Sequence, residues 1–165
     1  YVDDKLAWGI EPENTQLYQG KLDVASFNEN KVPNTNMISL SLGVVNRQAE
    51  AVKPSDIKIR YWFTNETSKA MASSIWYCKL GNIVNVKTVL NGTTQKSYAE
   101  FTFTDNAPLL YEGDSIYLKS EVNSSDWTNF SQLNDYSFDP VNTALSENMK
   151  MTAYINDSLV WGVEP

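Results

Sequence analysis

The sequence contains no histidine, and its single cysteine stands at position 78. Without histidine, a Ser-His-Asp triad, a Cys-His pair and every His-ligated zinc site are excluded. A lone cysteine forms neither an internal disulfide nor a thiolate metal cluster. We expect Cys78 to be partly buried and inert, since free cysteine usually behaves as a small hydrophobe. Catalysis could rest only on carboxylates, but 20 acidic residues always offer pairs and so do not by themselves indicate a glycosidase.

Basic residues are also scarce. The chain has 13 Lys and Arg against 20 Asp and Glu, which gives a net charge of −7. Nucleic acid is therefore not an expected partner, because phosphate binding needs a basic footprint. No apolar run is long enough to span a bilayer, and no membrane partner is expected. The 165 residues, 42% of them hydrophobic, suffice for one globular domain with an ordinary core, which we expect to be a monomer.

The two ends of the chain carry the same motif. Residues 1–12 (YVDDKLAWGIEP) and 154–165 (YINDSLVWGVEP) share Tyr, Asp, Leu, Trp, Gly, Glu and Pro in one register without a gap. This repetition predicts one module, residues 21–165, preceded by the tail of a similar module, residues 1–12, and by a polar linker, residues 13–20. A longer, multimodular parent protein follows from this interpretation. The alternative is a chance match between two short aromatic strands.

Apolar and polar residues alternate with period two in much of the chain. This pattern is typical of strands with one buried face, and Asn156-Asp157 is expected to be a tight hairpin turn. No segment shows a sustained helical period. Short strands separated by turns predict an antiparallel β-sandwich. The alternating segments are 38–44, 57–63, 101–103, 116–122 and 149–155.

Two tryptophans fall where core residues are not expected. Trp62 has the same parity as Lys58 and Arg60, and Trp127 follows the turn-like residues 123–126. Exposed aromatic surface often marks a binding site, and an indole can pack against the apolar face of a sugar ring. For Trp127, sugar binding and packing at one end of the sandwich both remain open. For Trp62, packing under a loop is the preferred interpretation.

Oxygen-bearing side chains cluster in residues 64–66 and 131–135. Calcium takes six to eight oxygen ligands, which two loops can supply together. A solvated turn with Asx-type hydrogen bonds gives a similar pattern. The residues alone favour the solvated turn.

Long, ordered motifs resemble the family 3 carbohydrate-binding modules, the cellulose-binding domains of bacterial cellulases and cellulosome scaffolds. They are residues 59–64 (IRYWFT), 125–129 (SDWTN) with 134–138 (NDYSF), and the ending 152–165. The resemblance runs from about residue 21 to 165. It implies an all-β, nine-stranded antiparallel jelly-roll β-sandwich with a structural calcium ion, in a secreted, extracellular protein that could be associated with a cellulosome. It also reverses the preference above and predicts calcium, because residues at the family's calcium positions keep an oxygen. These are Thr64, Glu66, Ser131, Asn134 and Asp135.

The cellulose-binding strip of the family is matched poorly. Cys78 and Lys79 stand where the family has an acidic residue and a ring, the following loop is short, and Glu121 replaces an arginine. A strip gains affinity by adding several ordered contacts on one plane, so we expect weak or absent binding to crystalline cellulose. Trp127 is retained, and two asparagines match positions that touch neighbouring sugar chains. The candidate carbohydrate-binding residues are Trp127, Asn30, Asn36, Arg60 and Trp62.

The repeated tail resembles the module order of some family 9 endoglucanases, in which two family 3 modules follow the catalytic domain. The predicted function is therefore that of a non-catalytic, divergent carbohydrate-binding module from a secreted cellulase of a clostridium-like bacterium. Its expected partners are plant cell-wall polysaccharide and the neighbouring modules of the same polypeptide. One alternative is a structural spacer that packs on those modules. Another is an extracellular polysaccharide-sensing module of an anti-sigma factor.

Overall fold

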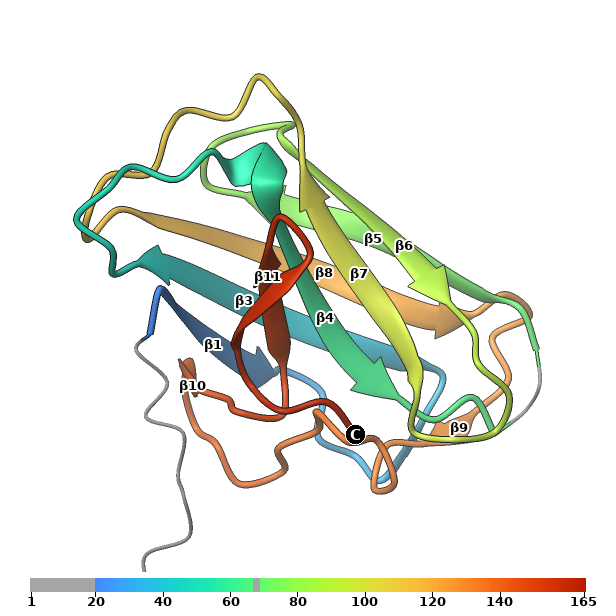
Figure 1. The fold of residues 1–165 in the computed structure, drawn as a ribbon. Helices are drawn as coiled ribbons and strands as arrows, with labels where there is room; N and C mark the ends of the chain where they lie inside the picture. Colours follow the sequence, from blue (N-terminus) through green and yellow to red (C-terminus); the bar gives the residue numbers. More distant parts are fainter. Residues whose placement is uncertain (1–19, 67–68) are drawn as a thin grey trace, which may run out of the picture.

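The computed structural model describes residues 20–66 and 69–165. The predicted tail, residues 1–12, and residues 13–19 of the predicted linker lie outside the described residues. Two five-stranded antiparallel sheets pack face to face (Figure 1). The β8 sheet has the order β10-β1-β3-β8-β5, and the β4 sheet has the order β12-β11-β4-β7-β6. Strands β2 and β9 form a separate pair.

The described residues form twelve strands where nine were expected, and three of the twelve are only two residues long. A single 3₁₀ turn, η1 (Pro54–Asp56), precedes β4, and no described helix is long and apolar enough to cross a bilayer. The strands are β1 (Leu22–Asn28), β2 (Asn34–Thr35), β3 (Met37–Asn46), β4 (Ile57–Phe63), β5 (Met71–Cys78), β6 (Val84–Val89), β7 (Ser97–Phe103), β8 (Ser115–Ser124), β9 (Phe130–Ser131), β10 (Ser146–Glu147), β11 (Thr152–Ile155) and β12 (Ser158–Trp161).

The expected all-β sandwich is confirmed, with one difference in its expected strands. Residues 38–44, 57–63, 101–103 and 116–122 all lie in strands. The predicted strand 149–155 begins only at Thr152, because the chain turns just before it and the backbone N–H of Met151 donates to the carbonyl of Asn148. Asn156 and Asp157 have φ angles of 49° and 63° and form the expected two-residue hairpin turn.

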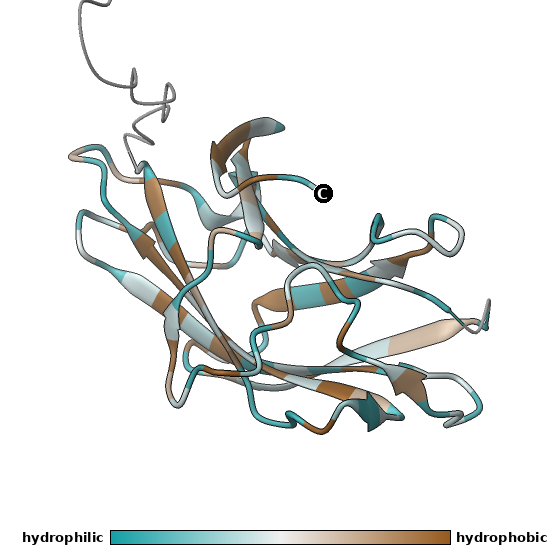
Figure 2. Ribbon diagram, turned by 90° about the horizontal axis from the view of Figure 1, so that it is seen from below, coloured by the Kyte–Doolittle hydropathy of each residue, from teal (hydrophilic) through white to brown (hydrophobic). Residues whose placement is uncertain are grey.

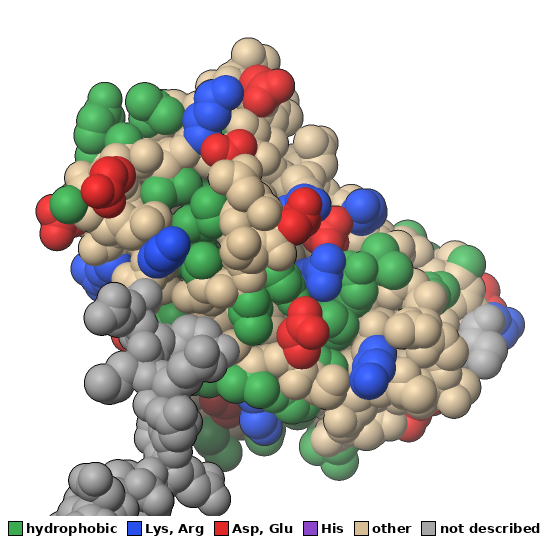
Figure 3. All heavy atoms as spheres, in the orientation of Figure 1, with side chains coloured by type: hydrophobic (Ala, Val, Ile, Leu, Met, Phe, Trp, Pro, Cys, Tyr) green, Lys and Arg blue, Asp and Glu red, His purple; other side chains and the backbone are tan. Residues whose placement is uncertain are grey.

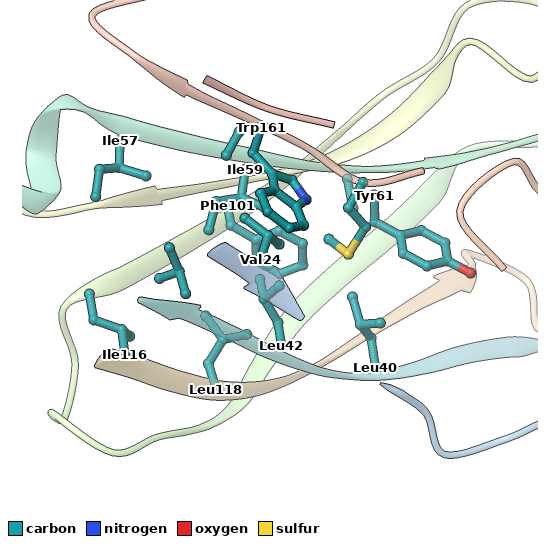
Figure 4. Close-up of a cluster of buried hydrophobic side chains, with 14 of the residues drawn as sticks. Val24, Leu40, Leu42, Ile57, Ile59, Tyr61, Phe101, Ile116, Leu118 and Trp161 are labelled. Carbon is teal, nitrogen blue, oxygen red and sulfur yellow. The ribbon is translucent and has the colours of Figure 1, made fainter. Parts of the chain in front are cut away.

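The core lies between the inner faces of the two sheets. Leu42 and Leu118 of the β8 sheet face Ile59 and Phe101 of the β4 sheet, and each is at most 1% exposed (Figure 4). Hydrophobic and hydrophilic residues alternate along the strands (Figure 2), as expected when one face of each strand is buried. Each buried aliphatic side chain contributes about 1.5–3 kcal/mol. The inner faces of the sheets are therefore filled by the core, and only the outer faces are accessible to a ligand.

The Trp-Gly pair of the repeated motif has a structural role in the C-terminal copy. Trp161 is 5% exposed and packs in the core, and its indole Nε1 donates to the carbonyl of Asn148 at 3.0 Å. Gly162 has a φ angle of +80°, and a Cβ there would lie 1.7 Å from the carbonyl oxygen of Met151. Only glycine accommodates this close approach. The C-terminal copy of the motif therefore anchors the end of the chain to the core of the sandwich.

Candidate functional site

The outer face of the β8 sheet carries a pair of tyrosines, of which Tyr77 is exposed and Tyr117 is half-buried. Tyr77 of β5 lies opposite Lys119 of β8, next to Tyr117, and the ring centroids of the two tyrosines are 6.1 Å apart. Tyr77 is 49% exposed. Because the side chains of β8 alternate between its two faces, Tyr117, Lys119 and Glu121 point away from the core, opposite to the buried Leu118.

A polar network lies beside these rings and fixes one of them. The hydroxyls of Ser41 and Tyr117 lie 3.0 Å apart, and the Ser41 hydroxyl also donates to Glu29 at 2.6 Å. The same Glu29 oxygen pairs with Lys119 at 2.6 Å. Lys119 first, and then Ser41, hold the pKa of Glu29 below its usual value. Tyr117 is therefore held in a network that spans β3 and β8.

Trp127 occupies the turn after the other end of β8. It is 54% exposed, with a φ angle of 59°, and its backbone N–H donates to the carbonyl of Ser124 at 3.0 Å. Asp126 braces this turn by accepting hydrogen bonds from the Ser124 hydroxyl and the Thr128 N–H, and by pairing with Lys69 at 2.6 Å. The seven-residue step from Tyr117 to Ser124 corresponds to roughly 24 Å at about 3.4 Å per residue. Exposed aromatic side chains thus stand at both ends of β8.

Asn30 and Asn36 are brought to the Trp127 end of the molecule. The loop that contains them pairs with the segment after Trp127 through β2 and β9. The Asn30 amide donates to the Thr35 hydroxyl at 2.8 Å, and its oxygen accepts from the N–H of Val32. The side chain of Asn30 therefore fixes its own loop, and the Asn36 side chain is half-buried.

The outer face of the β8 sheet is stepped rather than level. Leu145, just before β10, lies over Gly43 of β3, where a Cβ would come within 3.0 Å of its side chain. Gly43 is paired with Tyr117 in the neighbouring strand. Leu145 is 42% exposed, so an apolar ridge stands next to the tyrosine end of the face.

The structure separates Arg60 and Trp62 from the other candidate sugar ligands. Both belong to β4, in the opposite sheet from β8. Trp62 is only 5% exposed, and its indole Nε1 donates to the Thr152 hydroxyl at 2.9 Å. The expectation that Trp62 stacks on sugar is therefore contradicted by its burial. The Tyr98 ring packs edge-on against it with 4.8 Å between the ring centroids, and the Arg60 guanidinium lies 5.6 Å from its ring centroid.

Arg60 is the centre of a charged and aromatic cluster on the outer face of the β4 sheet. Its guanidinium lies 4.3 Å from the ring centroid of Tyr98 and 4.5 Å from that of Tyr154, and it pairs with Glu100 at 2.9 Å. Glu100 also pairs with Lys87 at 3.0 Å, and the two cations hold its pKa below the usual value against the opposing effect of burial. Figure 3 shows this face, where acidic and basic side chains lie beside one another among hydrophobic ones. Within the described residues, Arg60 and Glu100 form an ion pair in which each neutralises the charge of the other.

The predicted calcium ligands come together where β4 ends. The Thr64 backbone N–H donates to Asp135 Oδ1 at 2.8 Å, and the Thr64 hydroxyl donates to the carbonyl of Asn134 at 2.9 Å. Glu66 accepts hydrogen bonds from the Asn134 amide and from the backbone N–H of Ser131. The two segments that sequence reasoning paired are therefore in direct contact.

Two side-chain oxygens of this cluster are buried and lack a hydrogen-bond partner. They are Asn134 Oδ1 and Asp135 Oδ2. Burial, and then the nearby Glu66, raise the pKa of Asp135 to about 8, although the Thr64 N–H acts in the opposite direction. No three His, Cys, Asp or Glu residues gather in the described residues, so a cation here would rely on two carboxylates and neutral oxygens. Hard oxygen donors of this kind fit calcium, and unpartnered buried oxygens are what such an ion would satisfy.

Sequence reasoning missed Trp76 and Tyr77 as exposed residues. They are 51% and 49% exposed. The register between β5 and β8 shifts between Ile75 and Tyr77, so Trp76 is the extra residue of a β-bulge. The adjacent aromatic pair before Cys78 was the available signal, but alternation alone cannot place two successive residues on one face.

Comparison with known proteins identifies the family. A family model described as "Cellulose binding domain" matches residues 23–162. Exoglucanase-2 of Thermoclostridium stercorarium is 32% identical over 162 residues, which cover 95% of this chain and 18% of that protein. Endoglucanase A of Paenibacillus lautus is 35% identical over 134 residues, or 79% of this chain and 19% of that protein. The chain thus spans about a fifth of the length of these two relatives.

Solved structures agree in fold. The CBM3b module of the scaffoldin subunit ScaA from Acetivibrio cellulolyticus superposes with a TM-score of 0.82 at 32% identity, over 88% of this chain and 97% of that one. Biomass-sensing modules from putative RsgI-like proteins of Clostridium thermocellum give a TM-score of 0.81 at 28% identity, over 88% and 99% of the two chains. The predicted jelly-roll sandwich is confirmed by these neighbours. This chain belongs to the cellulose binding domain family, the family 3 carbohydrate-binding modules.

Proposed function

We propose that this chain is a non-catalytic module of a secreted cellulase that binds plant cell-wall polysaccharide through the outer face of β8 and β5. The observation that carries the proposal is the placement of exposed aromatic side chains at both ends of β8, with Tyr77 beside the half-buried Tyr117 at one end and Trp127 at the other. Rings stack on the apolar faces of sugars while the sugar hydroxyls remain in contact with water. Family membership and the glycoside hydrolases among the relatives support the same function.

The same face is poorly suited to a flat crystal. Leu145 rises over Gly43 beside the tyrosine pair, and Glu121 and Cys78 replace polar residues of the family's strip. A rigid planar surface cannot adapt to a ridge, whereas a single chain can follow the rings along β8. We therefore expect stronger binding to amorphous cellulose than to microcrystalline cellulose.

A structural calcium ion is the second part of the proposal. Asp135, Asn134, Thr64, Glu66 and Ser131 would hold it, and its positive charge would offset the burial of the Asp135 carboxylate. The unpartnered oxygens of Asn134 and Asp135 support this assignment. The ion would link the end of β4 to the loop after Trp127, and so keep that loop in place.

Depletion binding to microcrystalline cellulose, amorphous cellulose and xylan tests the proposal with calcium present. We expect binding to amorphous cellulose, and weakening by Trp127→Ala and by Tyr77→Ala. One stacking ring is worth about 1–3 kcal/mol by analogy with base stacking, so each change should lower the affinity roughly 5- to 150-fold. Tyr111→Ala is the matched control, since Tyr111 is 61% exposed but lies in the loop before β8, outside the proposed face.

Two results would count against the proposal. Tight binding to microcrystalline cellulose would show that the ridge and the substitutions do not matter. No binding to any of the three polysaccharides would remove the carbohydrate-binding function and favour the spacer hypothesis.

A sensing module is the second candidate. The biomass-sensing modules share 28% identity with this chain over nearly their whole length, so the fold serves both kinds of protein. The sugar-binding face proposed above would be common to both. The modules that adjoin this chain in its parent protein decide between them, and the sequence of the complete parent is the measurement required.

A further inference from the structure

The sandwich has an open side where two edge strands from different sheets meet. Strand β5 ends the β8 sheet and β6 ends the β4 sheet, and neither pairs with a further strand in the described residues. The Thr88 hydroxyl of β6 donates to the carbonyl of Met71 of β5 at 2.9 Å and joins the strands at one end. Towards the other end, near the short β5–β6 turn, a cleft of about 400 Å³ lies between them.

The β-bulge of β5 brings a tryptophan to this cleft. Ile75 packs against the core and Cys78 returns to it, so Trp76 and Tyr77 fall outside the normal alternation. Bulges commonly redirect a side chain in this way. Trp76 lines the cleft while about half of its surface stays exposed (51%).

The turn and β6 supply polar groups opposite the tryptophan. Gly81, with a φ angle of +84°, allows the tight turn, and its N–H donates to the carbonyl of Cys78 at 3.0 Å. Asn82 and Asn85, both exposed, line the cleft beyond it. An amide side chain offers both donors and an acceptor to hydroxyl groups.

We infer that this cleft between β5 and β6 is a second carbohydrate-binding site, which takes a single neutral glucan chain. None of the described residues that line the cleft is charged, which suits a neutral ligand and disfavours an acidic or basic one. An indole beside two asparagines supplies a stacking surface and hydrogen bonds to hydroxyls. Its volume lies in the range of about 300–1,000 Å³ that is usual for small ligands.

The inference rests on the proposed function only for the class of sugar. The two sites differ in shape, because the outer face of β8 is broad and the cleft is narrow. Tyr77 borders both sites, whereas Trp76 and Asn82 line the cleft alone and Trp127 belongs to the outer face alone. The two can therefore be tested separately.

The test is calorimetric titration of the 165-residue chain with cellohexaose. We expect binding that falls at least about tenfold in Trp76→Ala and in Asn82→Ala, and that Trp76→Phe partly preserves because a ring remains. Tyr111→Ala is the matched control, since it removes a ring that is 61% exposed and lies outside both the cleft and the outer face of β8, and it should leave cellohexaose affinity unchanged. Thermal unfolding of each variant confirms that it is folded.

The outcomes separate this inference from the proposed function. If Trp127→Ala abolishes cellohexaose binding and Trp76→Ala does not, the cleft is not the site, although the module still binds sugar. The same conclusion follows if the chain binds amorphous cellulose but not cellohexaose. If sedimentation shows a dimer that Trp76→Ala dissociates, the cleft is a protein interface and the inference is overturned. Amide chemical shifts that change at Gly81 and Asn82 on adding cellohexaose would support it.

Discussion

At the residue scale, Asp126 determines the geometry of the turn that carries Trp127. Its carboxylate joins the end of β8 to the next segment through Ser124 and Thr128, and Lys69 reaches it from another loop. These contacts, with Lys69 the strongest, hold the pKa of Asp126 well below its usual value. A tryptophan with a positive backbone φ angle is conformationally strained. The hydrogen bonds and the ion pair of the Asp126 carboxylate help to hold Trp127 in this conformation.

The sign of the pH effect follows from the lowered pKa. A carboxylate whose pKa is lower in the folded state than in the unfolded state stabilises the fold. The stabilisation is complete at pH values above the pKa of the unfolded state, which is about 4, and it is lost as the pH falls through the pKa of the folded state. We therefore expect Asp126→Asn to lower the melting temperature at pH 6, with a difference from wild type that shrinks below about pH 4. Thermal unfolding between pH 2.5 and 6 measures it. Asp105→Asn, in an exposed loop, controls for net charge, and a difference for Asp126→Asn that is the same at every pH would refute the prediction.

Sequence patterns located some of these residues and missed others for clear reasons. Trp127 was recognised because it follows a turn, where exposure is expected. Trp62 has the parity of a surface residue, but period-two alternation does not show which side chains pack over an outer face, and here Tyr98 and Arg60 pack on the indole. Trp76 was missed because a bulge breaks the alternation on which such predictions depend.

At the scale of elements, the ending of the chain is held by the backbone of a neighbouring segment. Gly162 follows β12 with its Cα against the carbonyl of Met151, just before β11. A side chain at this position would meet both an unfavourable φ angle and a backbone atom that cannot move alone.

Replacement of this glycine should therefore be more damaging than that of an unconstrained one. Gly92 also has a positive φ angle, of +64°, but a Cβ at Gly92 would have no other atom within 4 Å. We expect Gly92→Ala to cost about 1–2 kcal/mol from backbone strain. Gly162→Ala should cost a further ~1–3 kcal/mol from the overlap. Urea unfolding measures both, and equal losses would mean that the contact with Met151 relaxes without cost.

Burial asymmetry explains only part of which strands were predicted, since β1 alternates between buried and half-buried residues and was still not predicted. Strand β4 alternates between a buried and a wetter face and was located at its true ends. Strands β5 and β6 were not found, because at the open side of the sandwich neither face is fully buried. Edge position is a property of the tertiary structure, so local periodicity carries little information about it.

At the scale of the whole molecule, the proposed calcium ion would connect the β4 sheet to the loop that follows Trp127. Because Asp135 is buried, its charge without a cation is costly. Removing calcium with EDTA should lower the free energy of unfolding by about 2.7 kcal/mol relative to calcium at 100 times its dissociation constant.

Asp135→Asn distinguishes the ion from a general effect of EDTA. The amide keeps an oxygen for the Thr64 N–H but brings no negative charge, so this variant should lose most of its response to calcium. In EDTA it should be at least as stable as wild type, because no buried charge remains. Identical melting of wild type in calcium and in EDTA would contradict the assignment.

The open side of the sandwich also bears on how copies of this module would behave at high local concentration. A long, regular strand edge invites another chain to add to it, which is the usual start of aggregation. Here the bulge at Trp76 interrupts the spacing of backbone groups on β5, and the exposed Lys87 lies on β6. At the opposite edges, β10 and β12 have only two and four residues. The bulge that exposes an aromatic side chain thus also protects the module from edge-to-edge association.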